Sequence, residues 1–139
     1  MKGVLLTSHG NLAKGMYETT QWFLGKDIPQ YDYLCLEPND KMEDFDKQLF
    51  DKLKLLDSGD GVIVFADLFG GTPCNRCLQF MSERVLLVAG MNLTVVLELL
   101  GNRLSDNYDI ESLMETGKKG LVFVNNYQVV DTDEDDFLD

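Results

Sequence analysis

The sequence is short of positive charge and of long apolar runs. It has 12 lysines and arginines against 24 aspartates and glutamates, which gives a net charge of −12 with its one histidine neutral. Nucleic acids and anionic membranes attract proteins through positive charge, so we do not expect this chain to bind either nonspecifically, whereas a basic protein partner suits its charge. No apolar run approaches the roughly 20 residues of a membrane span. The start, Met1-Lys2-Gly3, leads into a strand rather than a signal peptide, so we expect a cytoplasmic protein.

Cysteine is also scarce, and the odd number of three leaves at least one thiol unpaired. In a chain without an export signal, Cys35, Cys74 and Cys77 are expected to be free thiols. Cys74 and Cys77 have the C-x-x-C spacing of redox centres and of half a zinc site, but only one other cysteine and one histidine could complete a ligand set. We interpret the pair as two thiols on a partly buried helix, and we predict no metal and no cofactor.

Residues 1–130 are predicted to form one domain of alternating strands and helices, which a length of 139 residues allows. Apolar runs predict strands, and apolar residues at helical spacing predict helices. The expected strands are 4–6, 31–37, 61–66, 84–89 and 121–124, and the expected helices are 13–24, 42–56, 73–81, 93–100 and 110–116. The acidic segment 131–139 is predicted to be a mobile tail.

Residues suited to helix ends set several of these boundaries. Gly25 fits a C-cap, and Asp40 is predicted to cap the second helix, with Glu43 completing a capping box. Thr72 is the expected N-cap of the third helix, and Pro73 suits the first helical position.

The alternation predicts an α/β fold, a three-layer sandwich with a parallel sheet and right-handed crossovers. In the flavodoxin-like order 2-1-3-4, the first and third strands are neighbours about 4.8 Å apart. His9, the only histidine, follows the first strand, and Asp67 follows the third, whose unbroken apolar run suits a central position. We therefore expect His9 to contact Asp67 at the switch point of the sheet, where ligands bind in such folds.

A third element is expected beside this pair. Gly70 and Gly71 precede the helix start at Thr72. Glycines let backbone N–H groups approach a ligand closely, and a helix N-terminus favours an anion. Taken singly, His9 is more typical of a surface imidazole and Asp67 of a helix-capping group, but together with the glycines they predict a phosphoryl site.

These three groups suggest phosphorylation of His9. A neutral imidazole has one nucleophilic nitrogen and one N–H. If Asp67 accepts that N–H, it fixes the tautomer and stabilises positive charge that develops on the ring, as the aspartate of a Ser-His-Asp triad does. The amides of Gly71 and Thr72 and the Thr72 hydroxyl could then hold the phosphoryl oxygens, so that catalysis rests on positioning and electrostatics.

Three segments, 8–15 (SHGNLAKG), 67–73 (DLFGGTP) and 90–93 (GMNL), are similar in order and spacing to those of a known family. They resemble the IIA domain of the mannose family of the phosphoenolpyruvate-dependent sugar phosphotransferase system (PTS). The resemblance covers roughly residues 2–126, and the first two motifs are specific in combination. Thr72 stands where many relatives have serine, and Thr94 where many have proline. No IIB sequence follows, which suggests a free-standing IIA subunit.

The resemblance implies that His9 and Asp67 are catalytic. His9 would accept a phosphoryl group from the carrier protein HPr and donate it to a histidine of the EIIB subunit, while Asp67 hydrogen-bonds His9. EIIB then phosphorylates a sugar of the mannose, fructose, sorbose or amino-sugar class, and the association with the membrane subunits EIIC and EIID is indirect. The family fold adds a fifth, antiparallel strand exchanged between the subunits of a homodimer, here residues 121–124.

Other functions fit parts of the pattern. The phosphocarrier of the dihydroxyacetone kinase system has a related fold, and a regulatory domain of this fold would share the motifs. A flavodoxin that binds FMN would use Thr7 and Ser8, but His9 and Lys14 depart from its pattern. A response-regulator receiver would be phosphorylated on Asp67, but it needs acidic residues after the first strand to hold Mg²⁺, and residues 7–9 supply none.

Overall fold

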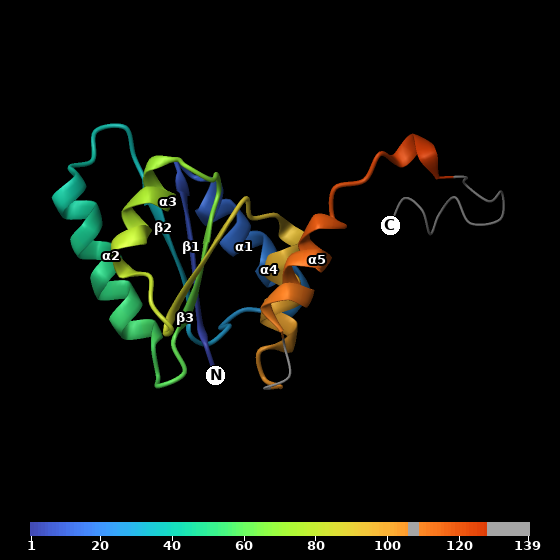
Figure 1. Cartoon of the computed structure of the whole chain (residues 1–139), viewed down its shortest axis with the longest axis horizontal. Coiled ribbons are helices and arrows are strands. Elements are labelled where there is room, and N and C mark those ends of the chain that lie inside the picture. The colour runs from blue at the N-terminus through green and yellow to red at the C-terminus, as the bar shows by residue number, and fades with distance from the viewer. Residues whose placement is uncertain (106–108, 128–139) are drawn as a thin grey trace.

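The computed structural model describes residues 1–105 and 109–127, and its centre is a parallel sheet of four strands (Figure 1). The strands are β1 (Gly3–His9), β2 (Tyr31–Leu36), β3 (Val62–Ala66) and β4 (Val85–Ala89). They lie in the order β2-β1-β3-β4, and each neighbouring pair is parallel. The predicted fold class and the order of the first four strands are confirmed.

Helices cover both faces of this sheet (Figure 1). On one face lie α2 (Met42–Leu56) and α3 (Thr72–Cys77), which is followed by the 3₁₀ turn η1 (Leu78–Phe80). On the other face lie α1 (Leu12–Leu24), α4 (Leu93–Asn102) and α5 (Ile110–Lys118). None of the helices in the described ranges is both long and apolar enough to cross a membrane.

The central strand β3 is buried on both faces, as its unbroken apolar run predicted. Ile63 and Phe65 belong to the core beneath α1, α4 and α5, whereas Val62 and Val64 belong to the core beneath α2. Because both cores close around β1 and β3, the carboxyl ends of these two strands are held side by side.

β1 is four residues longer than predicted, by Gly3 at its start and by residues 7–9 at its end. Thr7 and Ser8 are fully buried, and the pairing with β2 runs on to His9. The Thr7 hydroxyl donates a 2.8 Å hydrogen bond to the Leu34 carbonyl, which lets a polar residue continue a buried strand. His9 is therefore the last residue of the strand rather than part of a turn after it.

Two predicted helix caps are wrong. The Asp40 carboxylate does not cap α2, because it accepts the N–H of Glu37 at 2.8 Å and so closes the preceding turn. The N-cap of α3 is Gly71 rather than Thr72, because the Gly71 carbonyl accepts the N–H of Asn75 at 2.8 Å. Thr72 is therefore the first helical residue.

The end of α1 is as predicted, but its last turn is not part of the core. Gly25 is the C-cap, with φ +86° and its N–H bonded to the carbonyl of Gln21. Trp22, Phe23 and Leu24 are 89%, 61% and 43% exposed, although Phe23 and Leu24 continue the apolar spacing of the helix. The last turn of α1 therefore extends beyond the core and is exposed to solvent.

The segment 121–127 leaves the domain after α5 (Figure 1). It contains the 3₁₀ turn η2 (Val124–Asn126) and pairs with none of the four strands that the described residues form. The predicted fifth strand is thus not formed within one chain, and its exchange with a second chain stays a prediction. The predicted acidic tail, 131–139, lies outside the described residues.

A buried arginine that sequence reasoning missed joins α4 to the starts of β1 and β2. Arg103 is 3% exposed, and burial lowers the pKa of its guanidinium. The guanidinium donates to the backbone carbonyls of Lys2 at 3.2 Å, Gln30 at 3.0 Å and Pro29. These carbonyls lie just before the two strands, so Arg103 fixes both strand entries against the helical layer.

We expect Arg103→Met to lower the free energy of unfolding by about 2 to 4 kcal/mol, because three carbonyls lose a charged donor. Urea denaturation followed by circular dichroism measures the loss. Arg84→Met is the matched control, since the Arg84 side chain is 57% exposed and pairs with Asp57 at 2.7 Å. Such a surface pair contributes about 0 to 1 kcal/mol. Equal losses in the two variants would contradict the role given to Arg103.

Candidate active site

His9 and Asp67 meet at the carboxyl edge of the sheet, as the sequence predicted. His9 ends β1, and Asp67 directly follows β3, the neighbouring strand. One carboxylate oxygen, Oδ2 of Asp67, lies 2.8 Å from the imidazole Nδ1 of His9 and accepts the backbone N–H of His9 at 3.0 Å. The backbone N–H of Asp67 donates in turn to the carbonyl of Thr7 at 3.2 Å. The carboxylate is thus fixed against both the ring and the backbone of His9.

This contact determines which imidazole nitrogen is free. An ionised carboxylate only accepts hydrogen bonds, so the Nδ1 atom that faces it carries the proton and Nε2 has the lone pair. The His9 side chain is 48% exposed, whereas that of Asp67 is 9% exposed. The nucleophilic nitrogen is therefore accessible from solvent, while its orienting carboxylate is buried.

Gly71 touches the outer edge of the imidazole. A Cβ built on Gly71 would lie 2.7 Å from Cε1 and 3.4 Å from Nε2 of His9. Its φ of −78° is ordinary, so the requirement for glycine comes from this close approach and not from the backbone conformation. Gly70 has open space around it and a φ of +82°, so glycine serves there to allow the left-handed turn.

Thr72 supplies the free polar groups next to Gly71. Within the described residues, neither its N–H nor its hydroxyl forms a hydrogen bond. The N–H of Gly71 has only a long contact of 3.5 Å to the carbonyl of Leu68. Because α3 has only six residues, its dipole is small, and these individual donors are the groups that could bind an anion.

Two polar side chains that sequence reasoning did not assign hold the turns beside His9. The buried hydroxyl of Ser8 accepts the N–H of Ala13 at 2.7 Å and donates to the carbonyl of Gly10 at 3.1 Å, which fixes the turn into α1. The side-chain amide of Asn75 donates to the carbonyl of Gly70 at 3.1 Å. Ser8 lies within the first of the three sequence motifs, whereas Asn75 lies outside all of them. In the sequence, only its position five residues after Gly70 could have indicated this hydrogen bond.

The third motif supports the site from behind. The N–H groups of Gly90 and Met91 both donate to the carbonyl of Ala66, each at 3.0 Å. Asn92 caps α4 by accepting the N–H of Val95, and its amide donates to the carbonyl of Gly117 in α5. The loop after β4 therefore anchors the end of β3 directly before Asp67, and none of the hydrogen bonds that it forms in the described residues goes to His9.

The C-x-x-C pair consists of two buried free thiols. Cys74 and Cys77 are 2% and 1% exposed, and neither forms a disulfide. Burial raises the pKa of Cys77 to about 12, so this thiol stays protonated near neutral pH. The interpretation of the pair as buried helical thiols is confirmed.

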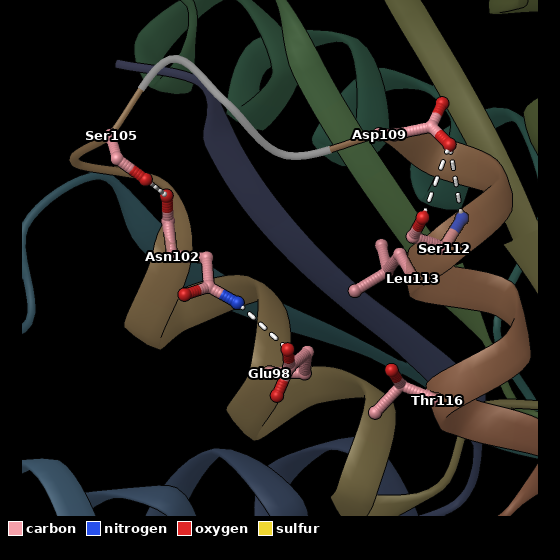
Figure 2. Close-up of a pocket in the computed structure, with 7 residues that line it drawn as sticks. All are labelled: Glu98, Asn102, Ser105, Asp109, Ser112, Leu113 and Thr116. Carbon is pink, nitrogen blue, oxygen red and sulfur yellow. Dashed lines mark hydrogen bonds between the residues drawn. The ribbon is translucent and has the colours of Figure 1, made fainter.

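A surface cavity of about 350 Å³ lies away from His9, between α4 and α5 (Figure 2). Its polar groups already bind one another, because Asn102 donates to Glu98 and Asp109 accepts from Ser112 (Figure 2). The remaining lining residues are Ser105, Leu113 and Thr116. The described residues that line this cavity therefore include no imidazole and no unpaired charge comparable to the His9 site.

A family model described as "EIIA-man: PTS system fructose IIA component" matches residues 3–116. The chain is 25% identical over 123 residues to the PTS system mannose-specific EIIAB component of Escherichia coli (strain K12). That match covers 85% of this chain and 38% of the relative, so the chain spans less than half of the relative's length.

Solved structures of PTS IIA proteins have the same fold. The PTS IIA protein associated with the fucose utilization operon from Streptococcus pneumoniae is similar with a TM-score of 0.83 and 29% identity, over 90% of this chain and 94% of that one. The mannose/sorbose specific IIA subunit of the phosphotransferase system from Enterococcus faecalis has a TM-score of 0.76 and 25% identity, over 94% of this chain and all of that one (100%).

We expect Gly71→Ala to displace the His9 ring and weaken its bond to Asp67, because the new methyl group would lie 2.7 Å from Cε1. Nitrogen-15 NMR of the neutral His9 side chain tests this: the unchanged protein should show a protonated Nδ1, and the variant a mixture of both tautomers. Gly101→Ala is the control, since a Cβ there meets nothing within 4 Å. An unchanged His9 spectrum in Gly71→Ala would disprove the close approach.

Proposed function

The chain belongs to the EIIA-man family of phosphotransferase system IIA components, and we propose that within it His9 is the phosphoryl carrier. His9 accepts a phosphoryl group from phosphorylated HPr and passes it to a histidine of the EIIB subunit. The observation that carries the proposal is the His9–Asp67 pair, because it leaves Nε2 of an exposed imidazole unprotonated beside the Gly71 backbone.

The transfer step uses the groups already in contact. The Nε2 lone pair of His9 attacks the phosphorus of the phosphohistidine on HPr, a new N–P bond forms, and the N–P bond to the HPr histidine breaks. That imidazole leaves with the electron pair of the broken bond. The Nδ1 proton of His9 stays on the ring, where Asp67 stabilises the positive charge that develops. Transfer to EIIB is the same step with His9 as the leaving group.

The phosphoryl oxygens are proposed to lie against residues 70–72. The Thr72 amide and hydroxyl and the Gly71 amide are candidate donors, because a Cβ on Gly71 would meet the ring and the Thr72 groups have no hydrogen-bond partner in the described residues. Gly70 provides the left-handed turn that brings these donors beside the imidazole. These donors would stabilise the charge on the phosphoryl oxygens by hydrogen bonding, while His9 alone forms the covalent bond to phosphorus.

Exposed apolar side chains around His9 favour a protein as the reaction partner. Leu12, at the start of α1, is 55% exposed, and Leu68 and Phe69, directly after Asp67, are 58% and 85% exposed. Exposed apolar residues grouped at a reactive centre are typical of protein docking surfaces. This supports protein partners such as HPr and EIIB. We further propose, from the family, that the chain acts in the cytoplasm and associates only indirectly with EIIC and EIID during import of a sugar of the mannose, fructose, sorbose or amino-sugar class.

A homodimer with exchanged strands is the proposed assembly. The apolar residues 121–124 are 44–90% exposed. One edge of β4 has no partner strand in the described sheet. Beside that strand lies a cavity of about 440 Å³, lined by Val88, Val95, Met114 and Leu121, among others. An open edge next to an unpaired apolar segment supports pairing of residues 121–124 with β4 of a second copy.

Incubation with phosphoenolpyruvate, enzyme I and HPr should label the chain on His9, with the acid-labile and base-stable linkage of a phosphoramidate. His9→Ala should abolish the label. Asp67→Ala should slow transfer by a factor on the order of 10² to 10⁴, because the ring loses its orienting acceptor. Full labelling of His9→Ala would exclude His9 as the carrier, and an unchanged rate in Asp67→Ala would show that the pair does not act together.

Sedimentation velocity at micromolar concentration should show a dimer. The double variant Leu121→Asp with Phe123→Asp should be monomeric, because charges replace two exposed apolar side chains of the exchanged segment. Leu104→Asp is the control, since Leu104 is 82% exposed but lies just after α4, outside the exchanged segment. A monomeric unmodified chain, or a dimer that survives the double variant, would contradict the exchange.

A further inference from the structure

We propose that Asn75 is a positioning residue for phosphoryl transfer at His9. It fixes two consecutive carbonyl groups, those of Gly70 and Gly71, on the α3 side of the turn and so keeps the glycine backbone against the imidazole. This inference rests on the proposed function and extends it to a residue that contacts neither the imidazole nor the phosphoryl group.

Asn75 bonds both glycines at once. Its side-chain amide donates to the carbonyl of Gly70 at 3.1 Å, and its backbone N–H donates to the carbonyl of Gly71 at 2.8 Å. No other hydrogen bond in the described residues uses the Gly70 carbonyl. The side chain of Asn75 therefore supplies the bond that determines where this carbonyl points.

The glycine pair needs such a restraint because glycine has more accessible backbone conformations than any other residue. Gly70 occupies the left-handed region at φ +82°, and its Cα has open space around it, so side-chain packing does not restrict this position. A hydrogen bond from a neighbouring helix restricts it instead. Loss of that bond would allow the peptide that joins Gly70 to Gly71 to rotate.

The orientation of this peptide affects the phosphoryl group directly. A carbonyl oxygen carries partial negative charge, so one that turned toward Nε2 of His9 would repel the phosphoryl oxygens. With both carbonyls bound to Asn75, the turn presents the Cα of Gly71 to the ring, and the adjacent Thr72 donors have no partner in the described residues. A Cβ on Gly71 would lie only 2.7 Å from Cε1 of His9, so a shift of this backbone toward the imidazole would also displace the ring relative to Asp67.

The test is single-turnover transfer from phosphorylated HPr, at rising HPr concentration, to the full chain carrying Asn75→Ala. Asn75 is exposed, so the variant should fold, and melting temperatures are compared throughout. We expect the maximal transfer rate to fall on the order of tenfold to a hundredfold, because the His9 ring would no longer be held in the position for attack. The half-saturating HPr concentration should change by less than about twofold, because the surface that binds HPr is unchanged.

Gln79→Ala is the matched control. Gln79 also donates a side-chain amide hydrogen bond to a backbone carbonyl, that of Arg76 at 3.0 Å, but it belongs to η1, away from the glycines. We expect a similar loss of melting temperature with an unchanged maximal rate. A wild-type rate in Asn75→Ala, or equal slowing in both variants, would overturn the inference. If the unmodified chain accepted no phosphoryl group from HPr, the proposed function would fail and the inference with it, an outcome distinct from the other two.

Discussion

The hydrogen bond between Nδ1 of His9 and Oδ2 of Asp67 is the interaction on which the site depends. The two residues are 58 positions apart in the chain and meet only because β1 and β3 are neighbours in the sheet. The same oxygen also accepts the backbone N–H of His9, so the carboxylate is fixed to the strand that carries the ring. The other carboxylate oxygen, Oδ1, is buried and has no partner among the described residues. All of the hydrogen bonding that the structure gives to this carboxylate is therefore directed at His9.

A steric constraint completes the arrangement. Asp67 fixes one side of the imidazole, and the Cα of Gly71 limits the other, so the ring has little freedom to turn. Hydrogen bonds from Ser8 and Asn75 hold the adjoining turns, and the amides of Gly90 and Met91 hold the end of β3. Each of these hydrogen bonds holds a different segment around His9 in place. The residues that form them need not contact a phosphoryl group. The chemistry is thus concentrated in one imidazole, and most of the surrounding residues position it.

Much of this could be predicted from the sequence because the strong signals were local. The unbroken apolar run of β3 predicted a central strand, and the alternation of strands and helices predicted the parallel order that brings His9 to Asp67. Two features were missed because a polar side chain is satisfied by a distant partner. Thr7 is buried because it bonds the carbonyl of Leu34, and Arg103 because it bonds carbonyls near residues 2 and 30. The shift of the α3 cap from Thr72 to Gly71 has a different cause, because both residues can occupy an N-cap and only the backbone bond from Asn75 distinguishes them.

The most direct test of the central claim is to identify which imidazole nitrogen carries the phosphoryl group. Phosphorus-31 and nitrogen-15 NMR of the phosphorylated chain, made with ¹⁵N-labelled histidine, reads this from the coupling between the two nuclei, and the single histidine makes the assignment unambiguous. Our account predicts phosphorus bonded to Nε2 of His9, with Nδ1 still protonated and facing Asp67. Phosphorus bonded to Nδ1 would mean that the bond to Asp67 does not orient the ring for transfer, and would contradict the account.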